Sequence, residues 1–365
     1  MSDAYSAAGV DTAAGERAVE LMRAAVARAT RPEVQGDLGG FAGLFDASAL
    51  ATYRRPLLAT ATDGVGTKVA VAQAMDIHHT IGIDLVAMVV DDIVVCGAQP
   101  LFLTDYIACG KVVPERIAAI VTGVAAGCEI AGCALLGGET AEHPGLLGPD
   151  EYDIAGAGTG VVEADALLGP ARVHAGDVVV AMASSGLHSN GYSLARKVLL
   201  ADTGWPVTRH SEWLGRTIGE ELLEPTRIYT RDCLALAADL GTDLHAFAHI
   251  TGGGLAANIA RVLPTHLAAD IRRDTWTPPP IFDLISHEGN LDAADVEHTF
   301  NMGVGMVAIV SAEVVDQALT TLADHHVPAW VAGDVRLRVD AEIGDAPAKG
   351  GTGGAVTLVG SHPAV

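Results

Sequence analysis

Residues 60–68, Thr-Ala-Thr-Asp-Gly-Val-Gly-Thr-Lys, carry the side chains that could bind a polyphosphate and its metal ion. They combine the carboxylate of Asp63, two glycines, the hydroxyl of Thr67 and the ammonium of Lys68. Glycine permits positive φ and close approach to a ligand, and successive N–H groups can then bind anionic oxygens. A carboxylate can hold a divalent cation. We predict a nucleotide-binding turn; the alternative is a tight strand-to-helix turn with a surface lysine.

Three aspartates interrupt the apolar segment 83–95, and their spacing predicts that Asp84, Asp91 and Asp92 share one side of a helix. Adjacent buried carboxylates repel each other and usually need a cation. Glu139 follows the apolar run 134–138, where a βα turn would present it to a cleft. These acids predict a metal site. The alternative is that Asp84 caps the helix and the others lie on a solvated stripe.

A second polar cluster, Ser-Ser-Gly-Leu-His-Ser-Asn-Gly-Tyr-Ser at 184–193, follows a buried-type strand and opens a predicted helix. Small polar donors at a helix N-terminus favour anion binding, although a multiply capped turn would explain one or two of them. Arg227 falls in the first turn of a helix expected at 226–240. His249 precedes a Thr-Gly-Gly-Gly loop and is either a site residue or a satisfied core histidine.

Composition limits the partners and the compartment. The formal net charge of −23 disfavours nucleic acid, which needs clustered Lys and Arg. The five cysteines form no Cys-x-x-Cys pair, which fits reduced thiols better than a disulfide framework. The first residues lack the pattern of a signal peptide, and aspartates break the longest apolar runs before a membrane could be spanned. We therefore expect a cytoplasmic protein with no membrane segment.

A length of 365 residues suggests about two domains, and strands alternate with helices in both halves. This pattern predicts an α/β fold with α+β mixed sheets. A linker is expected at 169–177 and a mobile, glycine-rich tail at the end. The predicted strands are 57–63, 101–108, 133–137, 152–163, 178–182, 244–249, 305–311 and 328–336. The predicted helices are 13–29, one opening at Thr67, 84–97, 114–131, 190–201, 226–240, one opening at 252–254, and 312–325.

Six ordered motifs resemble the phosphoribosylformylglycinamidine cyclo-ligase family, also called aminoimidazole ribonucleotide synthetases, from about Tyr5 to about Val339. They are 63–68 (DGVGTK), 137–142 (GGETAE), 188–194 (HSNGYSL), 225–229 (PTRIY), 251–254 (TGGG) and 299–305 (TFNMGVG). The chain departs from the family pattern at Asp91, usually Asn, and at His143, usually Met. It departs again at Leu187 and Ala260, usually Pro. These changes affect loop shape and remove no charged site residue.

The resemblance implies a homodimer that uses ATP and Mg²⁺. Residues 1–170 would form an N-terminal domain whose sheet pairs across the dimer into a β-barrel. Residues 171–341 would form an α/β domain that covers a cleft, and 342–365 the tail. The implied reaction is ATP-dependent ring closure of formylglycinamidine ribonucleotide through an O-phosphorylated iminophosphate, in purine biosynthesis. Since an amide oxygen is a poor leaving group, its phosphorylation activates the formyl carbon, and the protein contributes mainly positioning and charge.

Site roles follow residue by residue from the matching motifs and the chemistry of the side chains. The candidate catalytic residues are Lys68 and His249. The candidate ATP-binding residues are Gly36, Gly39, Gly40, Asp63, Gly64, Gly66, Thr67, Lys68 and Gly138. The candidate substrate-binding residues are Ser185, His188, Ser189, Asn190, Gly191, Arg227, Thr251, Gly252, Gly253 and Asn301. The candidate Mg²⁺ ligands are Asp63, Asp84, Asp92 and Glu139.

Two alternatives remain open from the residues. The Asp/Gly/Lys arrangement also resembles related phosphotransferases, such as thiamine monophosphate kinase, although the Ser-Asn-Gly-Tyr-Ser motif favours the cyclo-ligase. A non-catalytic nucleotide-binding regulator would bind ATP without turnover, and the apparently full set of site residues argues against it.

Overall fold

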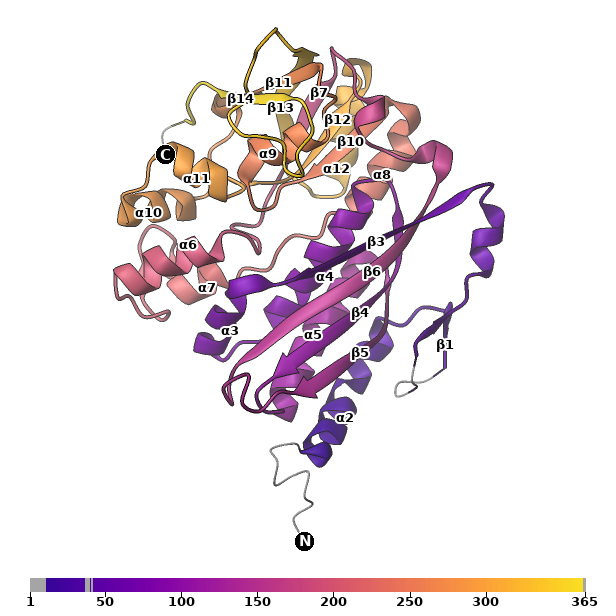
Figure 1. The fold of residues 1–365 in the computed structure, drawn as a ribbon, viewed down its shortest axis with the longest axis vertical. Helices are drawn as coiled ribbons and strands as arrows, with labels where there is room; N and C mark the ends of the chain where they lie inside the picture. Colours follow the sequence, from indigo (N-terminus) through magenta and orange to yellow (C-terminus); the bar gives the residue numbers. More distant parts are fainter. Residues whose placement is uncertain (1–10, 37–39, 41, 364–365) are drawn as a thin grey trace. The chain divides into compact units, whose positions relative to one another are not determined.

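The computed structural model describes residues 11–36, 40 and 42–363, which form two compact units. Unit 1 comprises Met1–Ile93 and Ala98–Ala164, and unit 2 comprises Val94–Gly97 and Asp165–Val365. The main boundary therefore falls between Ala164 and Asp165, six residues before the position predicted from the sequence. Each unit has its own sheet and its own helices (Figure 1).

Unit 1 is built on a four-stranded sheet in the order β3-β6-β4-β5. β3 pairs antiparallel with β6, β6 pairs antiparallel with β4, and β4 pairs parallel with β5. The sheet is thus mixed, as the sequence pattern predicts. Its strands are β3 (Pro56–Gly64), β4 (Gln99–Cys109), β5 (Ala134–Glu142) and β6 (Tyr152–Glu163). A small ribbon, β1 (Val34–Gln35) with β2 (Leu44–Phe45), precedes them.

Helices cover one face of this sheet (Figure 1). Three glycines of β6 leave space for side chains of α4, because a Cβ at each of them would meet Leu85, Val89 or Ile93. The three glycines are Gly156, Gly158 and Gly160. Glycines at 82 and 123 likewise let α4 and α5 approach at backbone distance. The helices of unit 1 are α2 (Thr12–Arg28), α3 (Val69–Met75), α4 (His79–Val94) and α5 (Pro114–Ala131).

The other face of the unit 1 sheet is exposed. Leu58 on β3 is 63% exposed and Tyr106 on β4 is 41% exposed. Burial alternates along β6 from Tyr152 to Gly158. Successive side chains of a strand point to opposite faces, so they lie in turn on the helix-covered face and on the open face. The sequence pattern of small and β-branched residues in these strands therefore produces one packed face and one open face.

Unit 2 contains a six-stranded sheet in the order β10-β12-β7-β13-β11-β14. Neighbouring strands are antiparallel, except that β11 and β14 run parallel. The strands are β7 (Val178–Ala183), β10 (Leu244–His249), β11 (Leu267–Arg272), β12 (Val304–Val310), β13 (Ala329–Leu337) and β14 (Ala355–Val359). Two-residue strands β8 (His210–Ser211) and β9 (Arg216–Thr217) form a separate ribbon.

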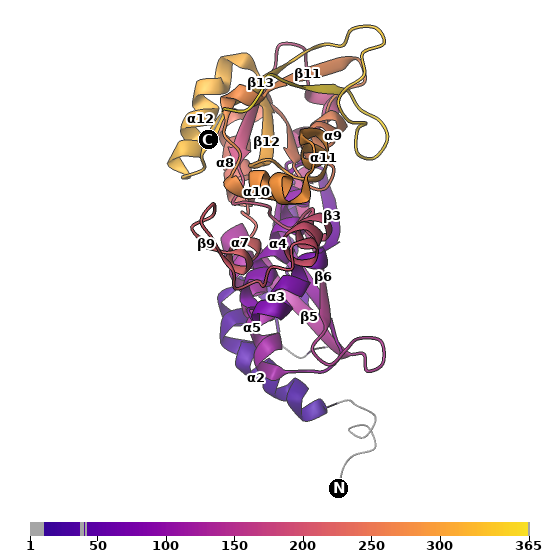
Figure 2. The ribbon, with the colours of Figure 1, turned by 90° about the vertical axis from the view of Figure 1, so that its left-hand side faces the viewer.

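The unit 2 sheet lies between α8 and α12 on one side and α9 and α11 on the other (Figure 2). Leu236 of α8 and Leu322 of α12 join the strand residues Val180, Phe247 and Met306 in one buried core. The helices are α6 (Tyr192–Arg196), α7 (Ile218–Leu222), α8 (Thr230–Leu240), α9 (Gly254–Arg261), α10 (Pro280–Gly289), α11 (Ala293–Thr299) and α12 (Val315–Asp324).

Three local expectations differ from the structure. α4 begins at His79 rather than at Asp84, and α8 begins at Thr230 rather than at 226. The segment expected to be a mobile tail supplies β14, which completes the edge of the unit 2 sheet beside β11. Its glycine-rich start concealed a short apolar strand pattern at 355–359. Within the described residues, no helix is both long enough and apolar enough to span a membrane.

Candidate functional site

The turn after β3 has the backbone geometry that its glycines suggest. Gly66 has φ 68°, in the left-handed region, and it starts a short 3₁₀ turn, Gly66–Lys68, that leads into α3. A Cβ at Gly64 would lie 3.0 Å from the carbonyl oxygen of Ile154. The Gly64 N–H donates to Asp63 Oδ1 at 2.7 Å, which orients the Asp63 carboxylate at the strand end.

Lys68 and Asp84 form a buried ion pair. Lys68 Nζ donates to Asp84 Oδ1 at 2.9 Å, and both side chains are 0% exposed. Because α4 starts at His79, Asp84 lies inside the helix and does not cap it. A charge taken out of water is tolerated only when it is paired and hydrogen-bonded, so each partner requires the other. Lys68, the one cation in the predicted nucleotide-binding turn, is thus paired with Asp84, which is one of the predicted metal ligands.

The three aspartates of α4 do not share one environment. Asp84 and Asp91 are 0% exposed, whereas Asp92 is exposed. Successive residues of a helix are about 100° apart, so Asp92 is turned away from the buried stripe that contains Asp91. The helix contains all three at the predicted spacing, but they do not form one buried acidic cluster, because Asp92 is at the exposed edge of that side. The choice of Asp92 over Asp91 as a metal ligand stays a prediction.

In the unit 1 sheet, two predicted site residues, Asp63 and Gly138, align across the strands with Asp105. Asp105 is not among the residues predicted from the sequence. Asp63 lies opposite Gly156 of β6, Asp105 of β4 lies opposite the same glycine, and Gly138 of β5 lies opposite Asp105. Residues opposite one another share a face. This is the face covered by α4, where Leu85, the neighbour of Asp84, packs against Gly156.

Asp105 is a buried carboxyl group, 9% exposed, whose Oδ2 has no hydrogen-bond partner among the described residues. Burial raises the pKa of Asp105 to about 7. A Cβ at Gly138 would collide with Asp105 Oδ1. Gly138, predicted to bind ATP, is therefore also required for packing. No local pattern indicates that Asp105 is buried, because a single Asp in the pattern Leu-Thr-Asp-Tyr of an apolar strand is typical of an exposed residue.

Glu139 lies one position beyond Gly138 and is exposed, but it is inside β5, which continues to Glu142. The expectation of a βα turn at Glu139 is therefore wrong. Glu139 is opposite Tyr106 in the sheet, so it projects to the open face, whereas Asp105 projects to the helix-covered face. Its Oε1 accepts the N–H of Thr140 at 3.0 Å. The carboxylate donors of unit 1 suit Mg²⁺, which prefers oxygen ligands. Among the described residues of unit 1, no three acids place ligand atoms within 4.8 Å of one another.

The glycine loop predicted at 36–40 is described in part. Gly36 has φ 88° and is exposed, and Gly40 is exposed, whereas Gly39 lies outside the described residues. Thr67 in the β3–α3 turn is exposed as well. The structure thus leaves Gly36, Gly40 and Thr67 at the surface of unit 1.

In unit 2, three loops predicted to bind the substrate meet through hydrogen bonds. Asn301 Nδ2 donates to the carbonyl of Gly186 at 2.9 Å, and Ser184 Oγ donates to Asn301 Oδ1 at 3.3 Å. Gly252 N donates to Asn190 Oδ1 at 3.0 Å. These bonds join the loops after β7 and β10 to the loop before β12. Segments far apart in the sequence therefore form one polar cluster in unit 2.

His188 is a packed residue in that cluster. It is 1% exposed, has φ 63°, and its Nε2 accepts the N–H of Ser185 at 3.1 Å. Its ring lies 6.1 Å from that of Tyr229, centroid to centroid. A Cβ at Gly305 would collide with both the Tyr229 hydroxyl and the His188 ring. The second glycine of the Gly-Val-Gly motif therefore makes room for these two side chains.

Lys349 is a site neighbour that sequence reasoning missed. Its Nζ donates to Thr251 Oγ1 at 2.8 Å, and its backbone N–H donates to the carbonyl of Ala257 on α9 at 3.0 Å. Thr251 Oγ1 in turn lies 3.3 Å from Asn258 Oδ1. The available signal was its rarity, since the chain contains only four lysines. The prediction that 342–365 is a tail excludes Lys349 from the site, and the contact with Thr251 corrects it.

The remaining predicted substrate residues lie on the same loops. Arg227 is half-buried and precedes α8, so the expectation that it lies in a helical first turn is wrong. Ser185 Oγ donates to the carbonyl of Pro225 at 2.6 Å, which ties this segment to the loop after β7. His249, the last residue of β10, is 7% exposed. The others, Ser189, Gly191 and Gly253, are half-buried on these loops.

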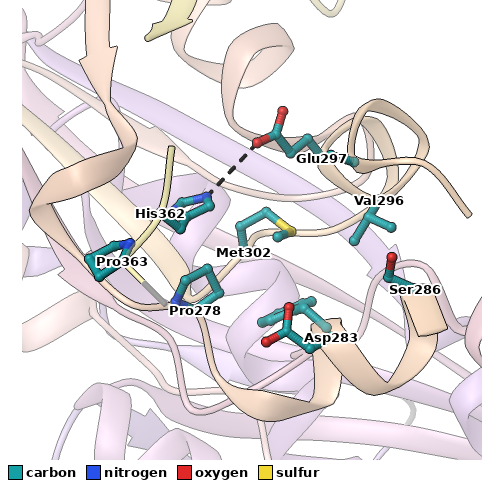
Figure 3. Close-up of a pocket in the computed structure, with 10 residues that line it drawn as sticks. Pro278, Asp283, Ser286, Val296, Glu297, Met302, His362 and Pro363 are labelled. Carbon is teal, nitrogen blue, oxygen red and sulfur yellow. Dashed lines mark ion pairs between the residues drawn. The ribbon is translucent and has the colours of Figure 1, made fainter. Parts of the chain in front are cut away.

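Unit 2 also contains a hollow of about 300 Å³ between α10, α11 and the C-terminal segment (Figure 3). Asp283, Glu297, Met302 and His362 line it, and His362 Nε2 lies 3.9 Å from Glu297 Oε1. Two carboxylates in a small lining disfavour an anionic ligand such as a nucleotide. None of the predicted substrate-binding residues lines this hollow, so we do not assign the substrate to it.

Comparisons with protein families match both halves of the chain. Residues 45–162 match the family described as AIR synthase related protein, N-terminal domain. Residues 174–343 match the corresponding C-terminal domain. A phosphoribosylformylglycinamidine cyclo-ligase of Shouchella clausii is 53% identical over 336 residues, which is 92% of this chain and 96% of the relative. One of a Geobacillus species is 49% identical over the same shares.

Solved structures share the fold at lower identity. A thiamine-monophosphate kinase from Stenotrophomonas maltophilia aligns with a TM-score of 0.64 and 19% identity, over 95% of this chain and 97% of that one. The hydrogenase maturation protein HypE in complex with ATP aligns with a TM-score of 0.59 and 18% identity, over 88% and 86%. At this identity the likeness concerns the fold alone.

Proposed function

Because this chain belongs to the phosphoribosylformylglycinamidine cyclo-ligase family, we propose how its own residues carry out the C–N bond-forming ring closure of purine biosynthesis. The proposed substrates are formylglycinamidine ribonucleotide and ATP with Mg²⁺, and the product is 5-aminoimidazole ribonucleotide. The observation that carries the assignment to individual residues is the joined polar cluster of unit 2, in which Asn190 contacts Gly252 and Asn301 contacts Gly186.

Unit 1 would bind the nucleotide. The exposed Asp63, Thr67 and Gly66 at the β3–α3 turn offer a carboxylate, a hydroxyl and a left-handed backbone to a phosphate and its cation. When bound, Mg²⁺ supplies charge neutralisation for the phosphates. The proposed holders are Asp63, Asp84 and Asp92. Glu139 projects to the opposite face of the sheet from Asp63 and would not share an ion with it.

Lys68 would act by positioning as well as by charge. In the chain alone its ammonium is fully buried against Asp84, so its direction is fixed before any ligand arrives. A preorganised charge needs little reorganisation when the transferring phosphoryl group develops its charge. If Asp84 turns toward a cation, the ammonium loses part of its partner and becomes available to a phosphate oxygen.

Unit 2 would bind the ribonucleotide. Hydroxyl and amide groups at the start of α6, together with the Thr251–Gly254 loop at the start of α9, provide neutral donors for a phosphate. Lys349, bonded to Thr251, and the half-buried Arg227 would add the positive charge that this acidic chain otherwise lacks. Ser189 and Asn190 are the proposed contacts to the ribose phosphate or the amidine.

The chemical step moves a phosphoryl group and then closes the ring. The formyl oxygen takes the γ-phosphoryl group, giving an iminophosphate and ADP. The amidine nitrogen then attacks the formyl carbon, the C–O bond breaks, and inorganic phosphate leaves. A proton must be removed from the attacking nitrogen, and His249, at the end of β10 beside Thr251, is the proposed acceptor.

We also propose that the chain forms a homodimer through the open face of the unit 1 sheet. The support is the pair of exposed apolar side chains, Leu58 and Tyr106, on a face that none of the described helices of unit 1 covers. Apolar side chains that project together from a sheet favour burial against a partner. Replacing Leu58 with Glu should shift the mass measured by light scattering toward that of a monomer.

One assay tests the reaction. Purified protein is mixed with formylglycinamidine ribonucleotide and MgATP, and ADP, phosphate and diazotisable aminoimidazole are measured together. Equal amounts of the three products are expected. A parallel reaction contains thiamine monophosphate in place of the ribonucleotide. Phosphorylation of thiamine monophosphate alone would favour a related kinase, and ATP binding without turnover in either reaction would favour a regulator. Either result would overturn the proposal.

A further inference from the structure

We propose that unit 2 carries a binding site for a divalent transition-metal ion, with Zn²⁺ as the ion to test, formed by His174, Asp177 and His245. One ligand atom of each residue lies within 4.8 Å of the other two. Imidazole nitrogens and a carboxylate oxygen are ordinary Zn²⁺ ligands, and three protein ligands with one water complete a tetrahedron. These residues belong to neither of the sites proposed above.

The first part of the site is a turn fixed on the sheet. His174 N donates to Asp177 Oδ2 at 2.7 Å, which closes the turn directly before β7. Gly176 N donates to the Val335 carbonyl at 2.7 Å, and Val335 N donates to the Asp177 carbonyl at 2.8 Å. The turn is therefore held against β13. The positions of the Asp177 carboxylate and of the His174 backbone are set by the fold.

The second part is His245 on β10. The pairing of β10 with β12 shifts register between Leu244 and Ala246, so His245 lies in a bulge. Bulges redirect a side chain and recur beside functional sites. His245 Nδ1 lies 2.7 Å from Asp177 Oδ2, and the two residues are only 8% and 5% exposed. The two atoms face one another, and a bound ion would take the place of the proton between them, since metal ligands bind in their deprotonated form.

The third part is access. A surface hollow of about 450 Å³ is lined by all three residues and by Ser311 and Glu313. Ser311 Oγ lies 3.4 Å from His245 Nε2. The His174 ring is exposed and meets the His245 ring edge to face at 5.3 Å between centroids. A small rotation of the exposed ring would bring its nitrogen closer to the other two ligand atoms, and solvent reaches the group.

The ligand set distinguishes the expected ion from Mg²⁺. Two imidazoles suit Zn²⁺ and similar transition metals, whereas Mg²⁺ selects oxygen ligands. A bound ion would connect the turn before β7 to β10. It would therefore add stability to unit 2, because it binds the folded chain and not the unfolded one.

The experiment uses the full-length protein after chelator treatment, in millimolar Mg²⁺ so that oxygen-only sites are occupied. Zn²⁺ is titrated calorimetrically, and the midpoint of thermal unfolding is measured with and without Zn²⁺. The test variant is His174→Ala, which removes an exposed side chain and should fold normally. The matched control is His266→Ala, an exposed histidine of the same unit outside the cluster.

Wild type and His266→Ala should each bind one more Zn²⁺ per chain than His174→Ala. If His174→Ala still binds this ion, its affinity should be about 10- to 100-fold lower than that of wild type. They should also gain thermal stability with Zn²⁺ that His174→Ala does not gain. Co²⁺ should give visible absorption bands that the same variant loses. Equal stoichiometry and affinity in wild type and His174→Ala would overturn the site and leave Asp177 and His245 as an ion pair only.

Discussion

The ammonium of Lys68 lies 2.9 Å from the carboxylate of Asp84, and neither side chain has any exposed surface. The pair connects the turn after β3 to the interior of α4. It is both a structural contact of unit 1 and the centre of its proposed nucleotide site. Stability and activity can therefore be separated by experiments on these two residues.

Single substitutions Lys68→Met and Asp84→Leu should each lower the free energy of unfolding by about 3–5 kcal/mol, because each leaves one buried charge without its partner. The double variant should lose much less than the sum, since an apolar pair replaces an ion pair. Urea unfolding of all four proteins gives the coupling energy. Strictly additive losses would contradict the role of the pair in the fold.

The same variants should lose activity whether or not stability is recovered. With Lys68→Met in the stable double variant, kcat/KM for ATP should fall on the order of 10²-fold or more, by analogy with other preorganised donors. Normal ATP kinetics in a folded variant without Lys68 would show that this lysine serves packing alone.

Lys349→Ala should raise KM for the ribonucleotide about tenfold and leave KM for ATP unchanged. A charge-assisted hydrogen bond of Lys349 to the ligand would be lost together with its contact to Thr251. Steady-state kinetics with each substrate varied separately measures both constants. Lys197→Ala is the control, because this exposed lysine pairs with Asp202 outside the loop cluster. A change in KM for ATP instead would exchange the two subsites.

Asp105 should make unit 1 less stable as the pH rises. Its pKa is about 7 in the folded chain because of burial and near 3.8 when unfolded, so the folded state holds the proton more strongly. The stabilising contribution is complete below pH 4 and is lost as the pH rises through 7. The free energy of unfolding of Asp105→Asn, measured relative to that of wild type, should therefore rise by about 3 kcal/mol from pH 5 to pH 8.

Urea unfolding at the two pH values measures this difference. Asp153→Asn is the control, since Asp153 is exposed on β6. If the difference in unfolding free energy between wild type and Asp105→Asn is the same at both pH values, Asp105 is not protonated in the folded chain.

Gly305→Ala should destabilise unit 2 by about 1–3 kcal/mol, because the new Cβ overlaps the Tyr229 hydroxyl and the His188 ring. It should also raise KM for the ribonucleotide by displacing the His188 loop. Adding Tyr229→Phe removes the clashing oxygen and should restore part of the stability, despite the loss of the 2.8 Å bond from Tyr229 to the Ala183 carbonyl.

Gly137→Ala is the matched control, because among the described residues no non-neighbouring atom lies within 4 Å of a Cβ at that position, and its φ is not positive. Equal losses in the two glycine variants, or no recovery with Tyr229→Phe, would contradict the packing role of Gly305.

Periodicity was sufficient for much of the fold. The alternation of apolar strands and amphipathic helices predicted the strands of unit 1 within a few residues, and α5 at Pro114–Ala131 matches its predicted range. Helix starts were less predictable, because residues 79–83 before Asp84 and the loop before Thr230 offer no strong N-cap. At the starts of α4 and α8, packing against the sheet determines whether the first turn is helical.

The sequence by itself determined the chemical groups and the family: the Asp-Gly-x-Gly-Thr-Lys turn, the polar loop after β7 and the order of the motifs. Only the tertiary structure decided which groups meet. Lys349 reaches Thr251 because β14 pairs with β11, and Asp105 is buried because Gly138 lies beside it. Local patterns report the period and polarity of nearby residues. Contacts between residues far apart in the sequence depend on strand order and side-chain packing, which no local pattern contains.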